Sequence, residues 1–390
     1  MSGPPHNYKV WCRNPEERLH EYFIPDNSFH TPFGCFPFNE WIDLGTKEAA
    51  LIVSPSLVSL ISYSGDEPIF WASGFCIESY NTNGIHFNNL LTSASLLCQA
   101  NNSPPHGFKV VVILPNGKRC HGDVINFDMH FNVAIIRIEL PTPLPCAILK
   151  RIDDSIQSFQ SGSHLVPHSS LFKLVPGNPL AALARFHVSP YSLMTAPGKF
   201  SIEPCDLDCR ELLRLNAKIS KFGIGGPIVN HFGEVVGISF YAEEFVPFLP
   251  INVVCKWWED VKTKKLYPKH CLGIQVSRLL SASSYQLLQI FQKFPTISKG
   301  INVEEVTEDS PASLAGICCG DVIVQFAGET VQSSMELLEA AWDKAGKRVD
   351  LTVLRSSDGA RLNLSMVVGG LSPEQYNEWP LPQECLKFID

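Results

Sequence analysis

The sequence has no apolar run of the roughly 18 residues that a membrane-spanning helix requires, which excludes a helical membrane protein. It also has no excess of basic residues: 31 Lys and Arg stand against 39 Asp and Glu, a formal net charge of −8. That balance argues against a nucleic-acid binder that works through bulk positive charge. The N-terminus lacks the apolar segment of a secretory signal and is too acidic for a transit peptide. We therefore expect a cytoplasmic or nuclear protein.

Internal repeats, low-complexity tracts and a glycine-rich phosphate loop are also missing. The 13 cysteines are odd in number and follow no disulfide framework, which favours free thiols in a reducing compartment. What remains is typical of a globular protein, with 45% hydrophobic and 18% charged residues. At about 100–200 residues per domain, the 390 residues predict two or three domains.

Composition and hydrophobic pattern divide the chain into four parts. Residues 1–45 are rich in Pro, Phe, Asn and charge and predict an N-terminal extension. Residues 46–265 carry short apolar runs separated by Gly, Pro, Asn and Ser, a pattern that predicts an antiparallel barrel or sandwich followed by a helix. Residues 270–370 alternate strands with helices, and residues 371–390 form a Pro-containing tail.

Four motifs follow one another in the β-rich part, and in order and spacing they resemble the protease half of the HtrA/Deg serine proteases. They are Ser73-Gly74-Phe75-Cys76-Ile77, Leu90-Leu91-Thr92-Ser93-Ala94-Ser95, Asp128-Met129-His130-Phe131-Asn132-Val133-Ala134-Ile135 and Phe222-Gly223-Ile224-Gly225-Gly226-Pro227-Ile228-Val229-Asn230. The later pieces Ser310-Pro311-Ala312, Gly320-Asp321-Val322-Ile323 and Gly328 are similar to a PDZ domain of the same family. The resemblance covers roughly residues 50–370. It implies a mostly β protein, a trypsin-like double antiparallel β-barrel followed by an α+β PDZ domain.

The catalytic positions that the resemblance implies carry the wrong residues. A chymotrypsin-like mechanism needs a His that accepts the Ser proton, an Asp that orients the His, and a Ser that attacks. Ser95 stands at the position of the His, Asn132 at that of the Asp, and Ile224 at that of the nucleophile. Loss of the Ser or the His alone costs about a millionfold in kcat in a protease with such a triad. We therefore expect no hydrolysis from this site.

The oxyanion hole of the family, the pair of backbone N–H groups that stabilises the developing negative charge, maps onto Phe222 and Ile224. Phe222 replaces a glycine and cannot adopt a glycine-only backbone conformation at low energy. Gly225 and Gly226 remain, which fits a tight turn kept for the fold. We therefore expect the protease fold to be kept although the groups needed for catalysis are absent.

Other residues offer weaker alternatives. Cys98 could form a nucleophilic pair with a nearby histidine such as His130, but a buried core cysteine is the better interpretation. Cys205 and Cys209 lack a second ligand pair at zinc spacing, so we interpret them as free surface thiols. We expect neither a metal nor a cofactor.

The PDZ-like part supplies a binding function. The resemblance places Gly300 and Ile301 at the entry of the carboxylate-binding loop into a strand with a free edge, to which an extended peptide can add as a further strand. Alternation places Ile301 and Val303 on one face, opposite Leu337 and Ala341 of a helix that follows Ser333. These five residues are the predicted peptide-binding set, although ordinary core packing would produce the same pattern.

The sequence thus favours a catalytically inactive HtrA/Deg-like pseudoprotease that binds peptide or protein segments through its PDZ groove. An active serine-type endopeptidase that uses residues not identified here is the first alternative. A regulatory subunit that assembles with itself or with an active HtrA/Deg-like protein is the second.

Overall fold

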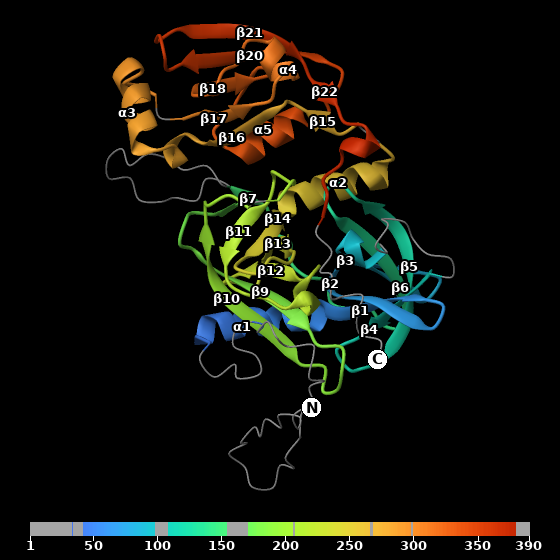
Figure 1. Cartoon of the computed structure of the whole chain (residues 1–390). Helices are drawn as coiled ribbons and strands as arrows, with labels where there is room; N and C mark the ends of the chain where they lie inside the picture. The colour runs from blue at the N-terminus through green and yellow to red at the C-terminus, as the bar shows by residue number, and fades with distance from the viewer. Residues whose placement is uncertain are drawn as a thin grey trace, which may run out of the picture.

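The computed structural model describes residue 33 and residues 42–97, 108–153, 171–205, 207–265, 268–297 and 299–379. Figure 1 shows two β-barrels packed together and a smaller α+β domain beyond them, with helix α2 (Ile251–Thr263) at the junction. The mostly β architecture expected from the sequence is confirmed. Most of the extension expected over residues 1–45 lies outside the described residues.

Six antiparallel strands close the first barrel. Its interior is a dry cluster that includes Val58, Leu60, Leu90 and Ile136, all fully buried. Burial of such side chains contributes roughly 1.5–3 kcal/mol each. Around the barrel the strands are β1 (Leu57–Ser64), β2 (Glu67–Thr82), β3 (Ile85–Thr92), β6 (Val133–Leu140), β5 (Arg119–Asp128) and β4 (Phe108–Ile113).

The second barrel repeats this arrangement with its own core, in which Phe33, Phe200 and Phe248 are the largest fully buried side chains. A turn at Asn230–Gly233 joins two of its strands as a hairpin, because Asn230 Oδ1 accepts the N–H groups of Phe232 and Glu234. Around the barrel the strands are β10 (Leu193–Ser201), β11 (Leu213–Asn216), β14 (Val246–Pro250), β13 (Val235–Ser239), β12 (Pro227–Asn230) and β9 (Pro179–Arg185). A short parallel pair, β7 (Ile152–Asp153) and β8 (Phe172–Lys173), lies outside it.

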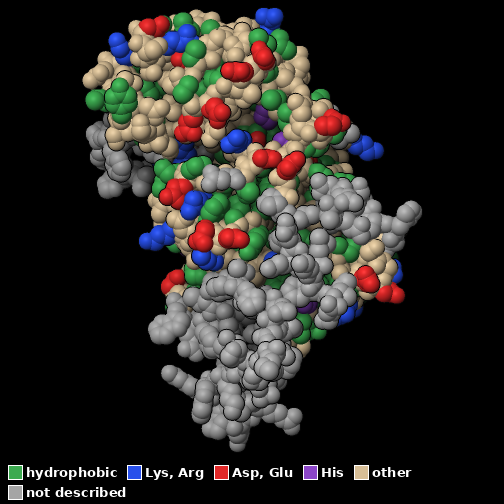
Figure 2. Space-filling view, viewed as in Figure 1, with side chains coloured by type: hydrophobic (Ala, Val, Ile, Leu, Met, Phe, Trp, Pro, Cys, Tyr) green, Lys and Arg blue, Asp and Glu red, His purple; other side chains and the backbone are tan. Residues whose placement is uncertain are grey.

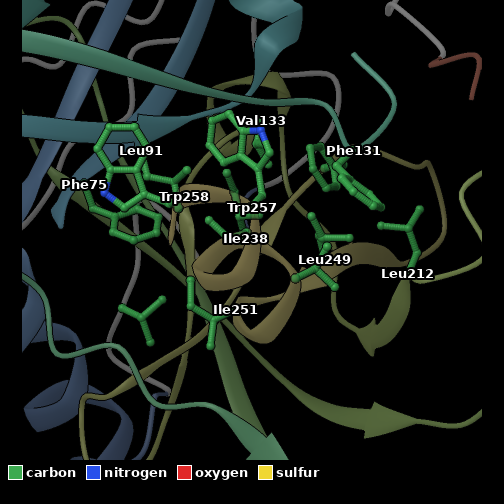
Figure 3. Close-up of a cluster of buried hydrophobic side chains, with 14 of the residues drawn as sticks. Phe75, Leu91, Phe131, Val133, Leu212, Ile238, Leu249, Ile251, Trp257 and Trp258 are labelled. Carbon is green, nitrogen blue, oxygen red and sulfur yellow. The ribbon is translucent and has the colours of Figure 1, made fainter. Parts of the chain in front are cut away.

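Helices α1 (Leu44–Val53) and α2 close a third cluster of apolar side chains that joins the two barrels. Figure 3 shows Trp257 and Trp258 of α2 among side chains that both barrels supply, such as Phe75 and Ile238. Because its residues come from the barrels and from α2, this inter-barrel cluster couples the position of the helix to the seam between the barrels.

The C-terminal domain is an antiparallel sheet with helices on its faces. The helix was predicted to have Ser333 or Ser334 as its N-cap, and Ser333 is the cap of α5, since its hydroxyl oxygen accepts the N–H of Glu336. The sheet runs β16 (Ile274–Arg278), β17 (Ile301–Val306), β18 (Asp321–Phe326), β20 (Arg348–Arg355) and β21 (Arg361–Val367), with β19 (Glu329–Thr330) beside β18. The other elements are α3 (Ser284–Lys293), α4 (Pro311–Leu314), α5 (Ser334–Ala341) and the pair β15 (His270–Cys271) and β22 (Gly369–Gly370).

Helix α5 packs the C-terminal domain against the barrels. Met335, Leu338 and Trp342 are buried within the inter-barrel cluster. The Trp342 ring stacks on Phe131 with centroids 5.6 Å apart, and its Nε1–H donates to Asp260 Oδ2 at 2.6 Å. One side chain thus connects the domain to a barrel turn and to α2. None of the helices within the described residues is long and apolar enough to cross a membrane.

We expect Trp342→Ala to lower the free energy of unfolding of the docked protein by about 3–5 kcal/mol, because it removes a buried aromatic ring and leaves a cavity. Urea unfolding followed by circular dichroism measures the change. Tyr285→Ala is the control, since that ring is 70% exposed on α3 and its loss should stay within about 0.5 kcal/mol. Equal stability of the two variants would show that Trp342 does not hold the domains together.

Candidate functional site

The loop of residues 222–226 lies in the seam between the barrels. It starts from a 3₁₀ turn, Lys221–Gly223, and leads into β12. From the first barrel, the N–H of Ser73 donates to the carbonyl of Ile224 at 2.9 Å and its hydroxyl donates to the carbonyl of Phe222 at 2.7 Å. From the second barrel, the Ser239 hydroxyl lies 2.7 Å from the carbonyl oxygen of Gly223. The loop is therefore held from both sides.

Two glycines of this loop are required by space. Gly225 has φ +78°, and a Cβ there would lie 2.6 Å from the carbonyl oxygen of Ser73. A Cβ on Gly226 would lie only 2.1 Å from the carbonyl oxygen of Leu183. Real Cβ atoms do not approach backbone so closely, so both positions need glycine for packing, independent of any catalytic role.

Ser95 and Asn132 lie together at the first-barrel side of the seam. The Asn132 amide oxygen accepts the N–H of Ser95 at 2.8 Å and the hydroxyl of Ser93 at 2.8 Å, and its Nδ2–H donates to Ser95 Oγ at 2.9 Å. All three side chains are buried. The pair forms a neutral hydrogen-bonded network with no group that titrates near neutral pH, so it can order the turns but cannot move a proton to a base.

Ile224 packs into the core of the first barrel. It is 3% exposed and belongs to the same apolar cluster as Ala94, Leu96 and Leu97, the neighbours of Ser95. An aliphatic side chain has no lone pair and no ionisable proton, so it cannot attack a carbonyl. The side chain fills space between the barrels instead.

The backbone beside Ile224 is also engaged. The N–H of Ile224 donates to the carbonyl of Lys221 at 3.0 Å within the 3₁₀ turn, and the N–H of Gly223 donates to the carbonyl of Ser220 at 2.9 Å. An oxyanion hole needs N–H groups aimed at the substrate oxygen. The Phe222 ring packs against Phe186 and His187, with centroids 5.5 Å and 4.9 Å away, within the second barrel's apolar cluster.

A cavity of about 680 Å³ opens where the barrels, α2 and the C-terminal domain meet. Ser95 lies on its wall with Phe131, Trp342 and Trp379, and Lys269 pairs there with Asp128. Figure 2 shows a hollow between the two parts of the molecule, with histidine and charged side chains at its edges.

A second cavity, of about 330 Å³, runs between β16 and α5. Ile274 and Val276 of β16 face Met335 and Leu337 of α5 across it. Among the described residues β16 pairs with β17 alone, so its outer edge is available for another strand. His130 and the loop that holds Asp208, Arg210 and Glu211 close the far side.

Comparisons with known proteins agree with this geometry. The trypsin-like peptidase domain model matches residues 72–238 and the PDZ domain model matches residues 271–368. The Do-like protein 14 of Arabidopsis thaliana is 28% identical over 355 residues, 87% of this chain and 75% of that protein. Human serine protease HTRA4 is 27% identical over 263 residues, 65% of this chain and 52% of that protein. The chain belongs to the HtrA/Deg-like family.

Solved structures of HtrA proteases have the same fold. The HtrA-type protease AlgW with tripeptide matches at a TM-score of 0.54 and 18% identity, over 84% of this chain and 98% of that one. At this identity the match speaks for the fold alone. It agrees with the double barrel and PDZ domain expected from the sequence, and the fold prediction is confirmed. The chain spans between about half and three quarters of the curated relatives named above.

The unpaired strand edge of this HtrA/Deg-like chain, with the cavity beside it, lies one strand away from the place predicted for a free edge. Strand β17, which begins at Ile301, pairs with β16 on one side and β18 on the other, so it has no free edge beside Ile301. Ile301, Val303 and Ala341 are fully buried in the domain core, and Leu337 alone of the predicted set lines the groove. The prediction for Gly300, Ile301 and Val303 was wrong, because periodicity identifies an apolar face but not the order of strands in a sheet.

The edge strand did carry a signal in the sequence. Leu272-Gly273-Ile274-Gln275-Val276 places a glycine between apolar residues and then alternates apolar with polar, which is the pattern of a loop that enters a strand. The C-terminal residues Asn377 and Trp379, which lie in the first cavity, carried no such pattern.

The alternative chemistry finds little support. Cys98 lies outside the described residues. His130 is 7% exposed, and burial, with Lys269 nearby, lowers its pKa to about 4. Cys205 and Cys209 are buried in the inter-barrel cluster, so their interpretation as surface thiols was wrong. Within the described parts of the chain no three His, Cys, Asp or Glu side chains gather as a metal site.

We expect acid to destabilise the protein between about pH 6.5 and pH 4. Burial lowers the pKa of both His130 and His270 to about 4, whereas the unfolded chain protonates near 6.5. As the pH falls through that window the unfolded state gains protons that the folded state does not bind, so stability decreases, on the order of 2 kcal/mol per histidine at pH 5.

Urea unfolding at a series of pH values measures this slope. His270→Gln should reduce the slope between pH 6.5 and pH 5 without abolishing it, since the amide does not titrate while burial still lowers the pKa of His130 and His187 to about 4. A wild-type slope in His270→Gln would contradict the assignment.

Proposed function

We propose that this HtrA/Deg-like chain is a catalytically inactive relative of serine endopeptidases that binds extended peptide or protein segments through its PDZ groove. The observation that carries the proposal is the joint replacement at the positions that the motifs assign to base, acid and nucleophile. Ser95 and Asn132 form a hydrogen-bonded pair, as the base and acid of a triad would, yet neither can accept a proton from a nucleophile. Ile224 offers none.

The size of the expected loss supports inactivity over weak activity. Removal of the nucleophile or the base alone costs about a millionfold in kcat, and the remaining acceleration comes from the oxyanion hole and from binding. At the oxyanion position the N–H of Ile224 is bonded to Lys221. Phe222 stands where a glycine is needed and packs into the second barrel's core. The contribution of an oxyanion hole is therefore weakened as well.

The groove between β16 and α5 supports the binding function. A peptide that lies along the outer edge of β16 can exchange backbone hydrogen bonds with it, which gives affinity without sequence preference. Ile274, Val276 and Leu337 supply apolar surface for alternate side chains of that peptide, which gives selectivity.

We expect the purified wild-type protein to show no cleavage of unfolded casein above the buffer control. A variant with Ser95→His, Asn132→Asp, Ile224→Ser and Phe222→Gly restores the residue types of the triad and the oxyanion loop, and should show detectable cleavage. The matched control is the variant that keeps Ser95 and carries only Asn132→Asp, Ile224→Ser and Phe222→Gly; it lacks the base and should show no cleavage. Cleavage by the wild type that survives Cys98→Ala and His130→Ala together would contradict the placement of the site.

We expect Ile274→Glu to weaken peptide binding at least tenfold, because it places a charge in the apolar groove. The probes are peptides selected from a displayed library of random C-terminal heptapeptides, with affinities measured by fluorescence anisotropy. Leu314→Glu is the matched control, since Leu314 is 79% exposed on α4 and does not line the groove. Equal affinities for the two variants would place the binding surface elsewhere.

A further inference from the structure

The C-terminal segment, residues 371–379, returns from the PDZ domain to the barrels. After β22 it makes a 3₁₀ turn, Pro373–Gln375, and its last four described residues lie against the turn between β5 and β6. That turn is the one that carries Asn132. The segment therefore contacts the element that holds the Ser95–Asn132 pair.

Two side chains of the segment make specific contacts with this turn. The Trp379 Nε1–H donates to the carbonyl of Met129 at 2.9 Å, and the Asn377 Nδ2–H donates to the carbonyl of His130 at 2.8 Å. The Tyr376 ring lies 5.4 Å from the His130 ring, and the N–H of Glu378 donates to Asp208 Oδ2 at 3.0 Å. Three consecutive residues of the segment, Asn377, Glu378 and Trp379, thus each donate a hydrogen bond to an acceptor on the barrels.

The Trp379 ring contacts the second barrel just after the end of β13. It packs on Phe240 with ring centroids 4.6 Å apart, and Phe240 directly follows Ser239, whose hydroxyl lies 2.7 Å from the carbonyl of Gly223. Trp379 and Ser95 line the same cavity. The segment occupies the space between the Ser95 side of the seam and the wall formed by Phe240.

The segment is attached by few contacts. Ser372, Pro373, Glu374 and Gln375 are exposed, and Tyr376, Asn377 and Trp379 are half-buried. Within residues 371–379 no strand pairing is present, so side-chain contacts and single hydrogen bonds hold the segment in place. Such segments open at low free energy compared with paired strands.

We propose that the former substrate cleft is a recognition site for a peptide segment with a tryptophan and an asparagine two residues before it, and that residues 376–379 fill this site in the free protein. The cleft thus retains peptide binding after the loss of catalysis, and a partner segment of the same chemistry replaces the chain's own. This deepens the proposed function, on which it rests, because it assigns a ligand class to the inactive cleft.

The two cavities are linked through this segment. Asn377 and His270 line both, and Gln375 and Leu371 line the PDZ groove. A peptide that adds to β16 enters the space that Gln375 and Asn377 border. Release of the segment from the cleft therefore removes part of the wall of the PDZ groove, so that peptide binding at the two sites is coupled.

The test uses full-length variants and a labelled synthetic peptide with the sequence of residues 372–384. In the wild type the attached segment competes at an effective concentration near the millimolar range, so the free peptide should not bind at micromolar concentration. In Trp379→Ala the cleft is vacant, and the free peptide should bind at least tenfold more tightly than to the wild type. The same peptide with alanine in place of its tryptophan should not bind.

Asn377→Ala should also admit the peptide, and it keeps the test valid if Trp379→Ala fails to fold. Ser372→Ala is the matched control in the exposed part of the segment and should behave as the wild type. Equal affinity of the peptide for all variants, or no binding to any, would overturn the proposal.

Parallel titrations with the library-selected PDZ peptides separate the two proposals. Tail-peptide binding to Trp379→Ala without any PDZ-peptide binding would reject the PDZ function and keep the cleft site. PDZ-peptide binding that is equal in wild type and Trp379→Ala, without tail-peptide binding, would reject the cleft site and keep the PDZ function.

Discussion

The fit of residues 222–226 between the barrels is the constraint on which the rest of the structure depends. Backbone of the first barrel lies so close to Gly225, and backbone of the second so close to Gly226, that neither position can carry a side chain. Ser73 and Ser239 bond to the carbonyls of the same loop from opposite sides. The loop sets the distance between the barrels, and that distance in turn sets the inter-barrel cluster and the place of α2.

This constraint explains how the fold can be kept whatever residue stands at position 224. Gly225 and Gly226, which follow position 224, serve the packing of the barrels, so they are needed whether or not a nucleophile precedes them. The side chain at position 224 is not needed to bring the barrels together, and an isoleucine there adds apolar contact to the first barrel's core. At Asn132 an amide oxygen still accepts the N–H of Ser95, so the turn keeps its hydrogen bonds without a charge.

The PDZ domain depends on the same assembly through α5. Met335, Leu338 and Trp342 bury against the inter-barrel cluster on one side, while Leu337 faces the groove and core of the domain on the other. The helix therefore belongs to both parts, and the groove beside it opens toward the barrels. The C-terminal segment lies at this junction because Trp379 finds an aromatic surface on Phe240 and acceptors on the turn at Met129 and His130.

Sequence alone determined the class of the fold, because short apolar runs and the order of the motifs are local properties that can be recognised without coordinates. Residue types also excluded Ile224 as a nucleophile. Tertiary structure decided which strand has a free edge, since Ile301 and Ile274 present the same alternation and only strand order distinguishes them. It also decided that Cys205 and Cys209 are buried and that Trp379 reaches the cleft. Contacts between residues more than a hundred positions apart leave no periodic trace in a sequence, so packing alone reveals them.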